Sequence, residues 1–305
     1  MTRKLITLAI SLLILGAIYY KIDIRRLAAV LANANPRFLV VSLGMVIPLT
    51  MLTAWRLQIL APTGANICFA ESNRLILAAS VLNMILPSKM GDIAKAWFMK
   101  SETAGGALTF SLVIFEKTAD MLSLLFWCAL GLLLYPRKDA VFWTLTVTVI
   151  LGLIGGIVLL ASRNLAALVF GFVGKIDKLA ALEAGWKEMQ DFFWSDKQRV
   201  IVVSVMSIFI WFLHLLQIWF FILALRASAP LLASIALGPL AILAGLLPLT
   251  FAGIGTRDAA LILLYKPYFA APVAAALGVL CTARYLIPAI AGLPFLHRYL
   301  SRIRA

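Results

Sequence analysis

Two carboxylates, Glu116 and Asp120, lie one helical turn apart within the otherwise apolar segment 107–134, and Thr109 and Ser123 extend the same stripe. A charged side chain at the centre of a bilayer costs about 2.5–3.5 kcal/mol on insertion scales, so the stripe must face a cavity or partners. Two carboxylates this close repel each other unless a cation lies between them or one holds a proton. The pair therefore predicts either a buried ion-pair network that locks the helices together or a direct role in handling a substrate or protons. The candidate cations are Lys95, Lys117 and Arg257.

A second chemical pair, Arg257 and Asp258, follows Gly255 at a point where a helix is expected to begin again. Free amides and the helix dipole attract anions to a helix N-terminus, and arginine binds phosphate through two parallel hydrogen bonds. An anionic lipid headgroup is the natural ligand for such a site. The alternative is that Arg257 and Asp258 only satisfy each other or the opposite pair. The first half of the chain offers the same parts in Lys89, Asp92 and Lys95.

Both groups lie in breaks of long apolar runs, at residues 86–95 and 247–258. Proline and glycine disfavour a continuous helix, and backbone at membrane depth must be buried in protein or line a cavity. Two broken hydrophobic segments in corresponding positions of two halves point to a substrate site between inverted repeats. The alternative is that each break is an ordinary interhelical turn at the membrane surface. The expected hinge residues are Pro87, Gly91, Pro248, Gly253 and Gly255.

The composition predicts a polytopic membrane protein. Of 305 residues, 63% are hydrophobic and 13% are charged, and the formal net charge is +14. A bilayer explains the basic excess, because cytoplasmic loops are rich in Lys and Arg and anionic headgroups attract them. The two histidines, His214 and His297, are too far apart in sequence to suggest a metal site, and no nucleotide-binding loop occurs, so no cofactor is expected. His214 and Gln217, with Trp211, either line a path or form interhelical hydrogen bonds.

The hydropathy pattern predicts an all-α fold with about six full crossings plus two re-entrant hairpins, at 71–99 and 231–265. Residues 1–161 form the first repeat half of a single membrane domain, and 200–305 form the second. The basic, amphipathic residues 162–199 between them are expected to form cytoplasmic surface helices. The expected crossings are 5–20, 38–60, 107–134, 140–161, 200–225 and 272–296.

Two further features concern the membrane surface. Trp55 and Arg56 end the second crossing and are expected at headgroup level, the indole beside a guanidinium that seeks phosphate. With six crossings both termini lie on one side, which also holds the larger share of the lysines and arginines. The positive-inside rule then predicts an inner-membrane protein with cytoplasmic termini.

Four motifs occur in a recognisable order: Trp55-Arg56, Asn83 to Leu86-Pro87 with Gly91-Asp92, Glu116 to Asp120, and Leu247-Pro248 with Gly253 to Asp258. In this order they resemble the lysylphosphatidylglycerol synthase/flippase transmembrane-region family, over nearly the whole chain. The resemblance implies a membrane unit with internal pseudo-symmetry that flips a modified lipid. The aminoacyl-transferase domain of those proteins has no counterpart here, so we expect no lipid aminoacylation. The departures from the usual residues are Lys117 for arginine, Asp92 and Asp258 for glutamate, and Thr250 for serine.

We therefore expect a lipid flippase or scramblase that moves a phospholipid or polyprenyl-linked headgroup through a central polar cavity. Arg257 and Lys95 would hold phosphate, while Glu116 and Asp120 would balance these cations or bind a cationic headgroup. One alternative is an intramembrane enzyme that uses the two carboxylates as acid and base. Another is a non-catalytic partner that presents lipid to a separate lipid-modifying enzyme docked on residues 163–199. The expected substrate-binding residues are Trp55, Arg56, Lys89, Asp92, Lys95, Glu116, Asp120, Arg257 and Asp258.

Overall fold

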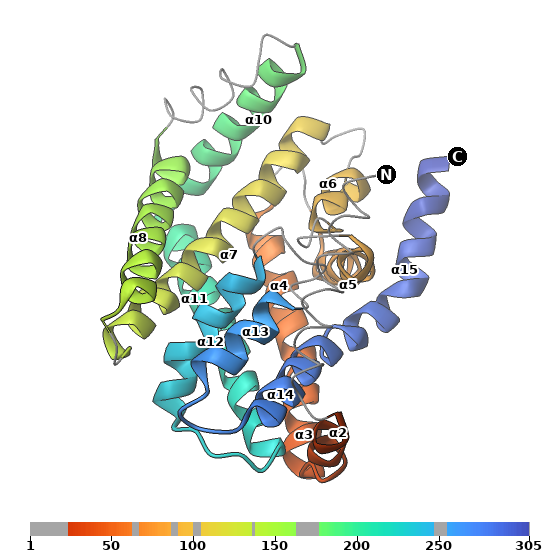
Figure 1. The fold of residues 1–305 in the computed structure, drawn as a ribbon. Coiled ribbons are helices and arrows are strands. Elements are labelled where there is room, and N and C mark those ends of the chain that lie inside the picture. Colours follow the sequence, from red (N-terminus) through yellow and green to blue (C-terminus); the bar gives the residue numbers. More distant parts are fainter. Residues whose placement is uncertain are drawn as a thin grey trace.

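The computed structural model describes residues 24–62, 67–86, 91–99, 105–135, 138–162, 177–246 and 255–304. All regular structure in these ranges is helical, which confirms the expected all-α fold (Figure 1). The helices of the first half are α2 (Ile24–Ala32), α3 (Pro36–Gly44), α4 (Val46–Leu60), α5 (Phe69–Ile85), α6 (Ala94–Met99), α7 (Gly106–Leu134) and α8 (Ala140–Ala161). The remaining helices are α10 (Asp177–Trp194), α11 (Lys197–Ala224), α12 (Leu231–Leu246), α13 (Thr256–Leu264), α14 (Ala271–Ala283) and α15 (Leu286–Arg304).

Five helical stretches among the described residues are long and apolar enough to cross a membrane. They coincide with five of the six expected crossings, and the sixth, at residues 5–20, lies outside the described residues. The protein is therefore a membrane protein with several transmembrane helices. The five stretches are Pro36–Leu60, Gly106–Leu134, Phe142–Ala161, Lys197–Ala224 and Ala271–Ser301.

Polar residues fix where several of these helices begin. The Asp139 side chain accepts a hydrogen bond from the Phe142 amide at 3.0 Å, and Asp196 accepts one from the Gln198 amide at 2.9 Å. Each carboxylate satisfies an amide that has no partner inside its helix, and its charge complements the helix dipole. The apolar runs behind these caps continue without interruption through α8 and α11.

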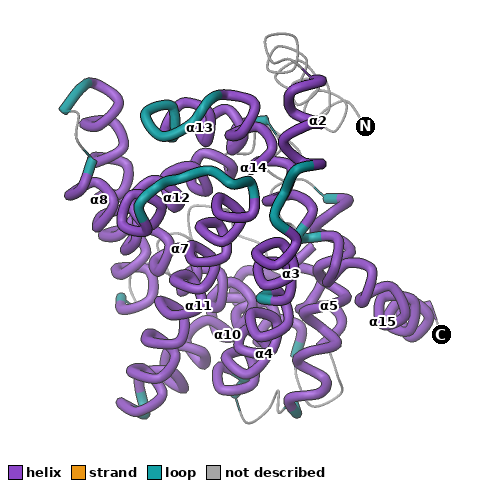
Figure 2. The backbone as a smooth tube through the Cα atoms, turned by 90° about the horizontal axis from the view of Figure 1, so that it is seen from below, coloured by secondary structure: helices purple, strands orange, loops and turns teal. Residues whose placement is uncertain are grey.

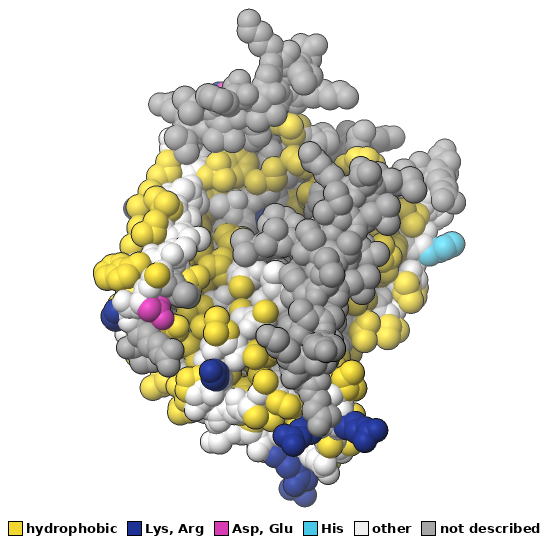
Figure 3. All heavy atoms as spheres, viewed as in Figure 1, with side chains coloured by type: hydrophobic (Ala, Val, Ile, Leu, Met, Phe, Trp, Pro, Cys, Tyr) yellow, Lys and Arg dark blue, Asp and Glu magenta, His cyan; other side chains and the backbone are white. Residues whose placement is uncertain are grey.

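Helices α4 and α11 pack against each other at the centre of the bundle, while α8 and α15 lie at opposite sides of it in both views (Figures 1 and 2). Apolar side chains are spread over the described part of the face shown in Figure 3. On α8, for example, Trp143, Leu151 and Ile154 are more than half exposed. An exposed apolar surface of this extent fits contact with lipid rather than water.

Glycines mark the closest helix contacts. A Cβ atom on Gly131 of α7 would lie 2.2 Å from the Ala236 carbonyl oxygen of α12. A Cβ on Gly292 of α15 would lie 2.0 Å from the Leu77 carbonyl oxygen of α5. Only a residue without a side chain allows backbones to approach this closely in a membrane bundle.

Each of the two expected breaks separates a pair of helices, α5 from α6 and α12 from α13. After the first break the chain returns onto α5, because a Cβ on Gly91 would lie 2.4 Å from the Asn83 nitrogen. After the second it returns onto α12, because a Cβ on Gly245 would lie 2.7 Å from the Arg257 Cβ. The expected restart of a helix after Gly255 is confirmed at α13. The turns themselves lie outside the described residues and include the predicted Pro87, Lys89, Pro248 and Gly253.

Helix α10 occupies the segment expected to form surface helices. It packs against α7, and Trp186 and Met189 on its inner face are fully buried. The Trp186 and Phe193 rings of α10 both contact the Phe115 ring of α7. One face of α10 therefore belongs to the core that supports the polar residues of α7.

Candidate functional site

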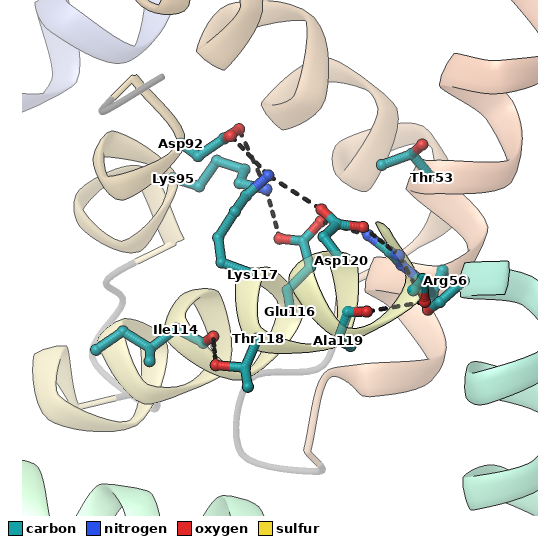
Figure 4. A network of polar contacts seen from close by, with 12 residues as sticks. Thr53, Arg56, Asp92, Lys95, Ile114, Glu116, Lys117, Thr118, Ala119 and Asp120 are labelled. Carbon is teal, nitrogen blue, oxygen red and sulfur yellow. Dashed lines mark hydrogen bonds and ion pairs between the residues drawn. The ribbon is translucent and has the colours of Figure 1, made fainter. Parts of the chain in front are cut away.

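Six charged side chains from three parts of the chain form a closed ring in which positive and negative groups alternate (Figure 4). Helix α7 contributes three of them, α4 contributes one, and α6 with the turn before it contributes two. We call this group the charge ring. In order around the ring, its members are Asp92, Lys95, Glu116, Arg56, Asp120 and Lys117.

Arg56 closes one side of the ring. Its Nη1 lies 2.6 Å from Asp120 Oδ1, and its Nη2 lies 3.4 Å from Glu116 Oε1. Nη1 also donates a hydrogen bond to Ser207 Oγ of α11 at 3.0 Å. The side chains of Arg56 and Glu116 are fully buried. One guanidinium thus joins α4 to α7 and α11.

Two lysines close the other side. Lys117 Nζ lies 2.7 Å from Asp92 Oδ2 and 3.2 Å from Asp120 Oδ2. Lys95 Nζ lies 3.6 Å from Asp92 Oδ1 and also forms an ion pair with Glu116 Oε2. The segment after the first break is therefore bound to α7 through charge, and Thr109 strengthens this attachment by donating a hydrogen bond to the Ala96 carbonyl.

Each carboxylate of the ring thus contacts two cations, and three positive groups balance three negative ones. The repulsion expected between Glu116 and Asp120 is resolved by cations, as the sequence suggested, but Arg56 takes the place that was considered for Arg257. The expectation that the Arg56 guanidinium seeks lipid phosphate beside Trp55 is wrong, because Glu116 and Asp120 bind it inside the bundle. Successive residues of a helix point about 100° apart, so Arg56 enters the bundle while Trp55 remains 51% exposed.

The ring lies at the depth of the membrane-spanning helices. Gly156 of α8 lies against Leu122 of α7, and Gly152 lies against Leu125, so the two helices pack closely and antiparallel here. Asp120 is therefore level with the last turns of the α8 span. Charges at this depth are tolerated because the ring satisfies them internally.

Arg257 and Asp258 form a separate group at the start of α13. Arg257 Nη2 lies 2.7 Å from Asp258 Oδ1 and donates to the Gly278 carbonyl and to Thr282 Oγ1 of α14. Asp258 Oδ2 accepts a hydrogen bond from the Gly255 amide at 3.1 Å. The Asp258 carboxylate therefore caps the N-terminus of α13, where an anionic ligand was expected. Arg257, which was expected to bind phosphate, binds Asp258 and α14 instead.

Two adjoining cavities lie between the charge ring and the middle of the bundle. The first, of about 170 Å³, is lined by Asp92, Lys117 and Asp120 of the ring. The second, of about 130 Å³, reaches Gln217 and Thr50. Five residues line both cavities: Thr53, Ser80, His214, Arg284 and Tyr285. Trp211 and His214 line the first cavity, and His214 and Gln217 line the second, while Gln217 also forms the interhelical hydrogen bonds that were the alternative.

Arg284 is the principal residue of these cavities that the sequence analysis did not identify. It follows α14 and is only 4% exposed. Its Nη1 donates to Gln217 Oε1 at 2.9 Å, and Gln217 Nε2 in turn donates to the Ser42 carbonyl at 2.7 Å. An arginine inside the apolar run 272–296 was the available signal, because intramembrane arginines mark functional sites by default.

The arrangement can hold a polar group inside the membrane. Ser207 contacts the ring and Gln217 contacts Arg284, and these two residues of α11 are about 15 Å apart along the helix axis. Buried polar contacts therefore span roughly half of a hydrocarbon layer about 30 Å thick. Among the described residues no group of three or more His, Cys, Asp or Glu side chains could hold a metal ion.

Comparison with known proteins agrees with the order of motifs. Residues 4–292 match the family model described as the Lysylphosphatidylglycerol synthase TM region. The chain is 25% identical over 315 residues to the UPF0104 membrane protein MJ1595 of Methanocaldococcus jannaschii, and the alignment covers 95% of this chain and 93% of the relative. No solved structure matches the chain. The chain therefore belongs to the family of the lysylphosphatidylglycerol synthase transmembrane region.

Proposed function

We propose that the protein is a flippase or scramblase that moves the headgroup of a phospholipid or polyprenyl-linked lipid across the membrane. The headgroup passes through the two cavities while the acyl chains stay in the bilayer. The observation that carries the proposal is the series of polar side chains that line the two cavities from the charge ring to Arg284 and Gln217, within helices long and apolar enough to span a membrane. Polar groups at this depth are expected on a substrate pathway.

The packing supports an inverted repeat, which is the usual framework for such a site. Helix α5 packs against α15 as α12 packs against α7, and each contact centres on a glycine, Gly292 or Gly131. Arg56 of α4 reaches the carboxylates of α7, and Gln217 of α11 reaches Arg284 after α14. In this proposal α5–α6 and α12–α13 are the two re-entrant hairpins, and the breaks between them are the hinges.

The experiment is headgroup-resolved transbilayer movement in proteoliposomes. Wild type is compared with Glu116→Gln, which removes a fully buried charge of the ring, and with Glu183→Gln as the matched control. Glu183 pairs with Lys187 on α10 at 2.7 Å and is partly exposed. We expect lipid movement in wild type and in the control and a clear loss in Glu116→Gln, with all three proteins eluting as folded species.

Three results would contradict the proposal. Folded wild-type protein that moves no anionic, zwitterionic or polyprenyl lipid above protein-free vesicles would exclude lipid transport. Formation of a new product from a lipid-linked substrate, without movement, would favour the intramembrane enzyme instead. Activity that appears only when a separate lipid-modifying enzyme is added would favour the lipid-presenting partner, with the region around α10 as its docking surface.

A further inference from the structure

Arg284 differs from the other cations inside the bundle in its partners. Arg56, Lys95, Lys117 and Arg257 each form an ion pair with a carboxylate. Among the described residues, Arg284 forms no ion pair, and its guanidinium donates only to the Gln217 amide oxygen and to the Tyr285 hydroxyl, each at 2.9 Å. Removing a guanidinium from water without a counter-charge is unfavourable. The site therefore lacks one negative charge.

A ligand that carries this negative charge has space to bind beside Arg284. Arg284 lines both cavities, and its Nε, which is buried, has no hydrogen-bond partner in the described part of the chain. The Asn83 side chain lines the first cavity, and its Oδ1 is likewise buried without a partner there. An empty donor on a buried guanidinium beside a cavity indicates a ligand that accepts hydrogen bonds.

The neighbouring charges specify how much negative charge the ligand brings. The charge ring that lines the far end of the first cavity is neutral as a group, so it neither supplies nor requires a counter-ion. Arg284 is thus the source of a single uncompensated positive charge at the cavities. A phosphate monoester carries about −1.5 to −2 at neutral pH, whereas a phosphodiester carries one negative charge and matches this site.

The hydroxyls of the cavity walls specify the rest of the headgroup. Thr50, Thr53 and Ser80 each donate their hydrogen to the backbone carbonyl four residues earlier, at 2.7–2.8 Å. Their oxygens can therefore only accept hydrogen bonds from a ligand. A headgroup with hydroxyls can donate to them. A headgroup with an ammonium group can also donate, but it would restore the uncompensated positive charge.

We propose that Arg284 binds the phosphodiester of a lipid whose headgroup is uncharged and carries hydroxyls. Arg284 holds the phosphate through Nε and the guanidinium edge, and the hydroxyls of the headgroup donate to Thr50, Thr53 and Ser80. This inference rests on the proposed function only in assuming that lipid headgroups enter the cavities. It makes Arg284, rather than Arg257, the phosphate-binding residue.

The test is direct binding to purified protein in an uncharged detergent, followed by intrinsic tryptophan fluorescence, since Trp211 lines the first cavity. Four short-chain or soluble probes are compared: dioctanoyl phosphatidylglycerol, dioctanoyl phosphatidylcholine, dioctanoylglycerol and glycerophosphoglycerol. We expect saturable binding that is tightest for the phosphatidylglycerol. Equal binding of the phosphatidylcholine or of dioctanoylglycerol would overturn the proposal, and equal binding of glycerophosphoglycerol would show that the ligand is not a lipid.

Two variants report on Arg284 itself. Arg284→Gln should weaken binding of the phosphatidylglycerol about ten- to a hundredfold, the effect of one lost charged hydrogen bond. Arg298→Gln makes the same chemical change on an exposed arginine of α15 and should leave binding unchanged. Unaltered binding in Arg284→Gln would overturn the assignment.

A third variant keeps the arginine, and its fold is checked by its elution as a single species. Gln217→Glu places a carboxylate where the amide oxygen now lies, 2.9 Å from Arg284 Nη1, and so supplies the missing counter-charge from the protein. It should abolish the preference for the anionic probe in a folded protein. Retained preference would overturn the proposal. Binding without transport would exclude the proposed function and support the Arg284 site. Transport with the same headgroup preference in wild type and in Arg284→Gln would support the proposed function and exclude the Arg284 site.

Discussion

Arg56 and Asp120 are 64 residues apart in the chain, yet their side chains lie 2.6 Å apart inside the bundle. The contact joins α4 to α7 at the depth of the membrane-spanning helices. Because the ring is closed, each of its cations also restrains a second carboxylate, so the loss of one member disturbs two neighbours. The charge ring therefore fixes the segment after the first break against the central helices α4 and α7.

Arg56→Gln should destabilise the protein by about 3–5 kcal/mol, because it leaves the fully buried Glu116 and the partly buried Asp120 with one cation each. Unfolding in mixed micelles measures the change. Asp120→Asn and the double variant complete a cycle, and we expect a coupling of about 0.5–3 kcal/mol, as for residues in one network. Additive effects would mean that Arg56 and Asp120 do not contact each other in the folded protein.

The glycine contacts make a second prediction that concerns packing alone. Gly131→Ala places a Cβ 2.2 Å from a backbone oxygen of α12, which cannot move independently of its helix. Overpacking of this kind costs about 1–3 kcal/mol. Gly155→Ala on α8 is the control, because a Cβ there meets nothing within 4 Å. It should be neutral or slightly stabilising in the same unfolding assay. Equal effects of the two substitutions would contradict the close approach of α7 and α12.

The natural cysteines test the orientation. Cys68, just before α5, is exposed, whereas Cys128 and Cys281 are buried. If both termini are cytoplasmic, Cys68 also faces the cytoplasm, since α5 follows a crossing that ends inside. A membrane-impermeant maleimide should then label the protein in inside-out vesicles and not in spheroplasts. Cys68→Ser should abolish the labelling. Labelling in spheroplasts would show that the protein has the opposite orientation.

Much of the fold could be predicted because apolar length and helix-breaking residues are local properties. Five crossings and the two breaks follow from such patterns, and so does the restart of a helix at Thr256. The stripe of Glu116 and Asp120 likewise required cations, and Lys95 and Lys117 were among those considered. These conclusions needed no knowledge of which helices are neighbours.

The partners of the arginines could not be predicted, because they depend on helix rotation and packing. Arg56 was assigned to the surface from its position at the end of a crossing, but α4 turns it inward. Arg257 was assigned to phosphate, yet Asp258 and the backbone of α14 already bind it. Arg284 was not predicted as a site residue, because its importance comes from the absence of a carboxylate partner among the described residues. This absence can be recognised only when the positions of the surrounding helices are known.

Gly255 makes the last prediction, which concerns the second break. Its φ of 108° lies in the region that L residues with a side chain rarely adopt, and it caps α13. Gly255→Ala should cost about 1–2 kcal/mol of stability, the penalty of a left-handed backbone for one residue with a Cβ. Gly105 is the matched control, since it caps α7 with a φ of −57° and a Cβ there meets nothing within 4 Å. Gly105→Ala should change stability by less than about 0.5 kcal/mol. If Gly255 is also a hinge, lipid movement by Gly255→Ala should remain slow at temperatures where the variant is fully folded. Normal movement under those conditions would restrict Gly255 to a structural role.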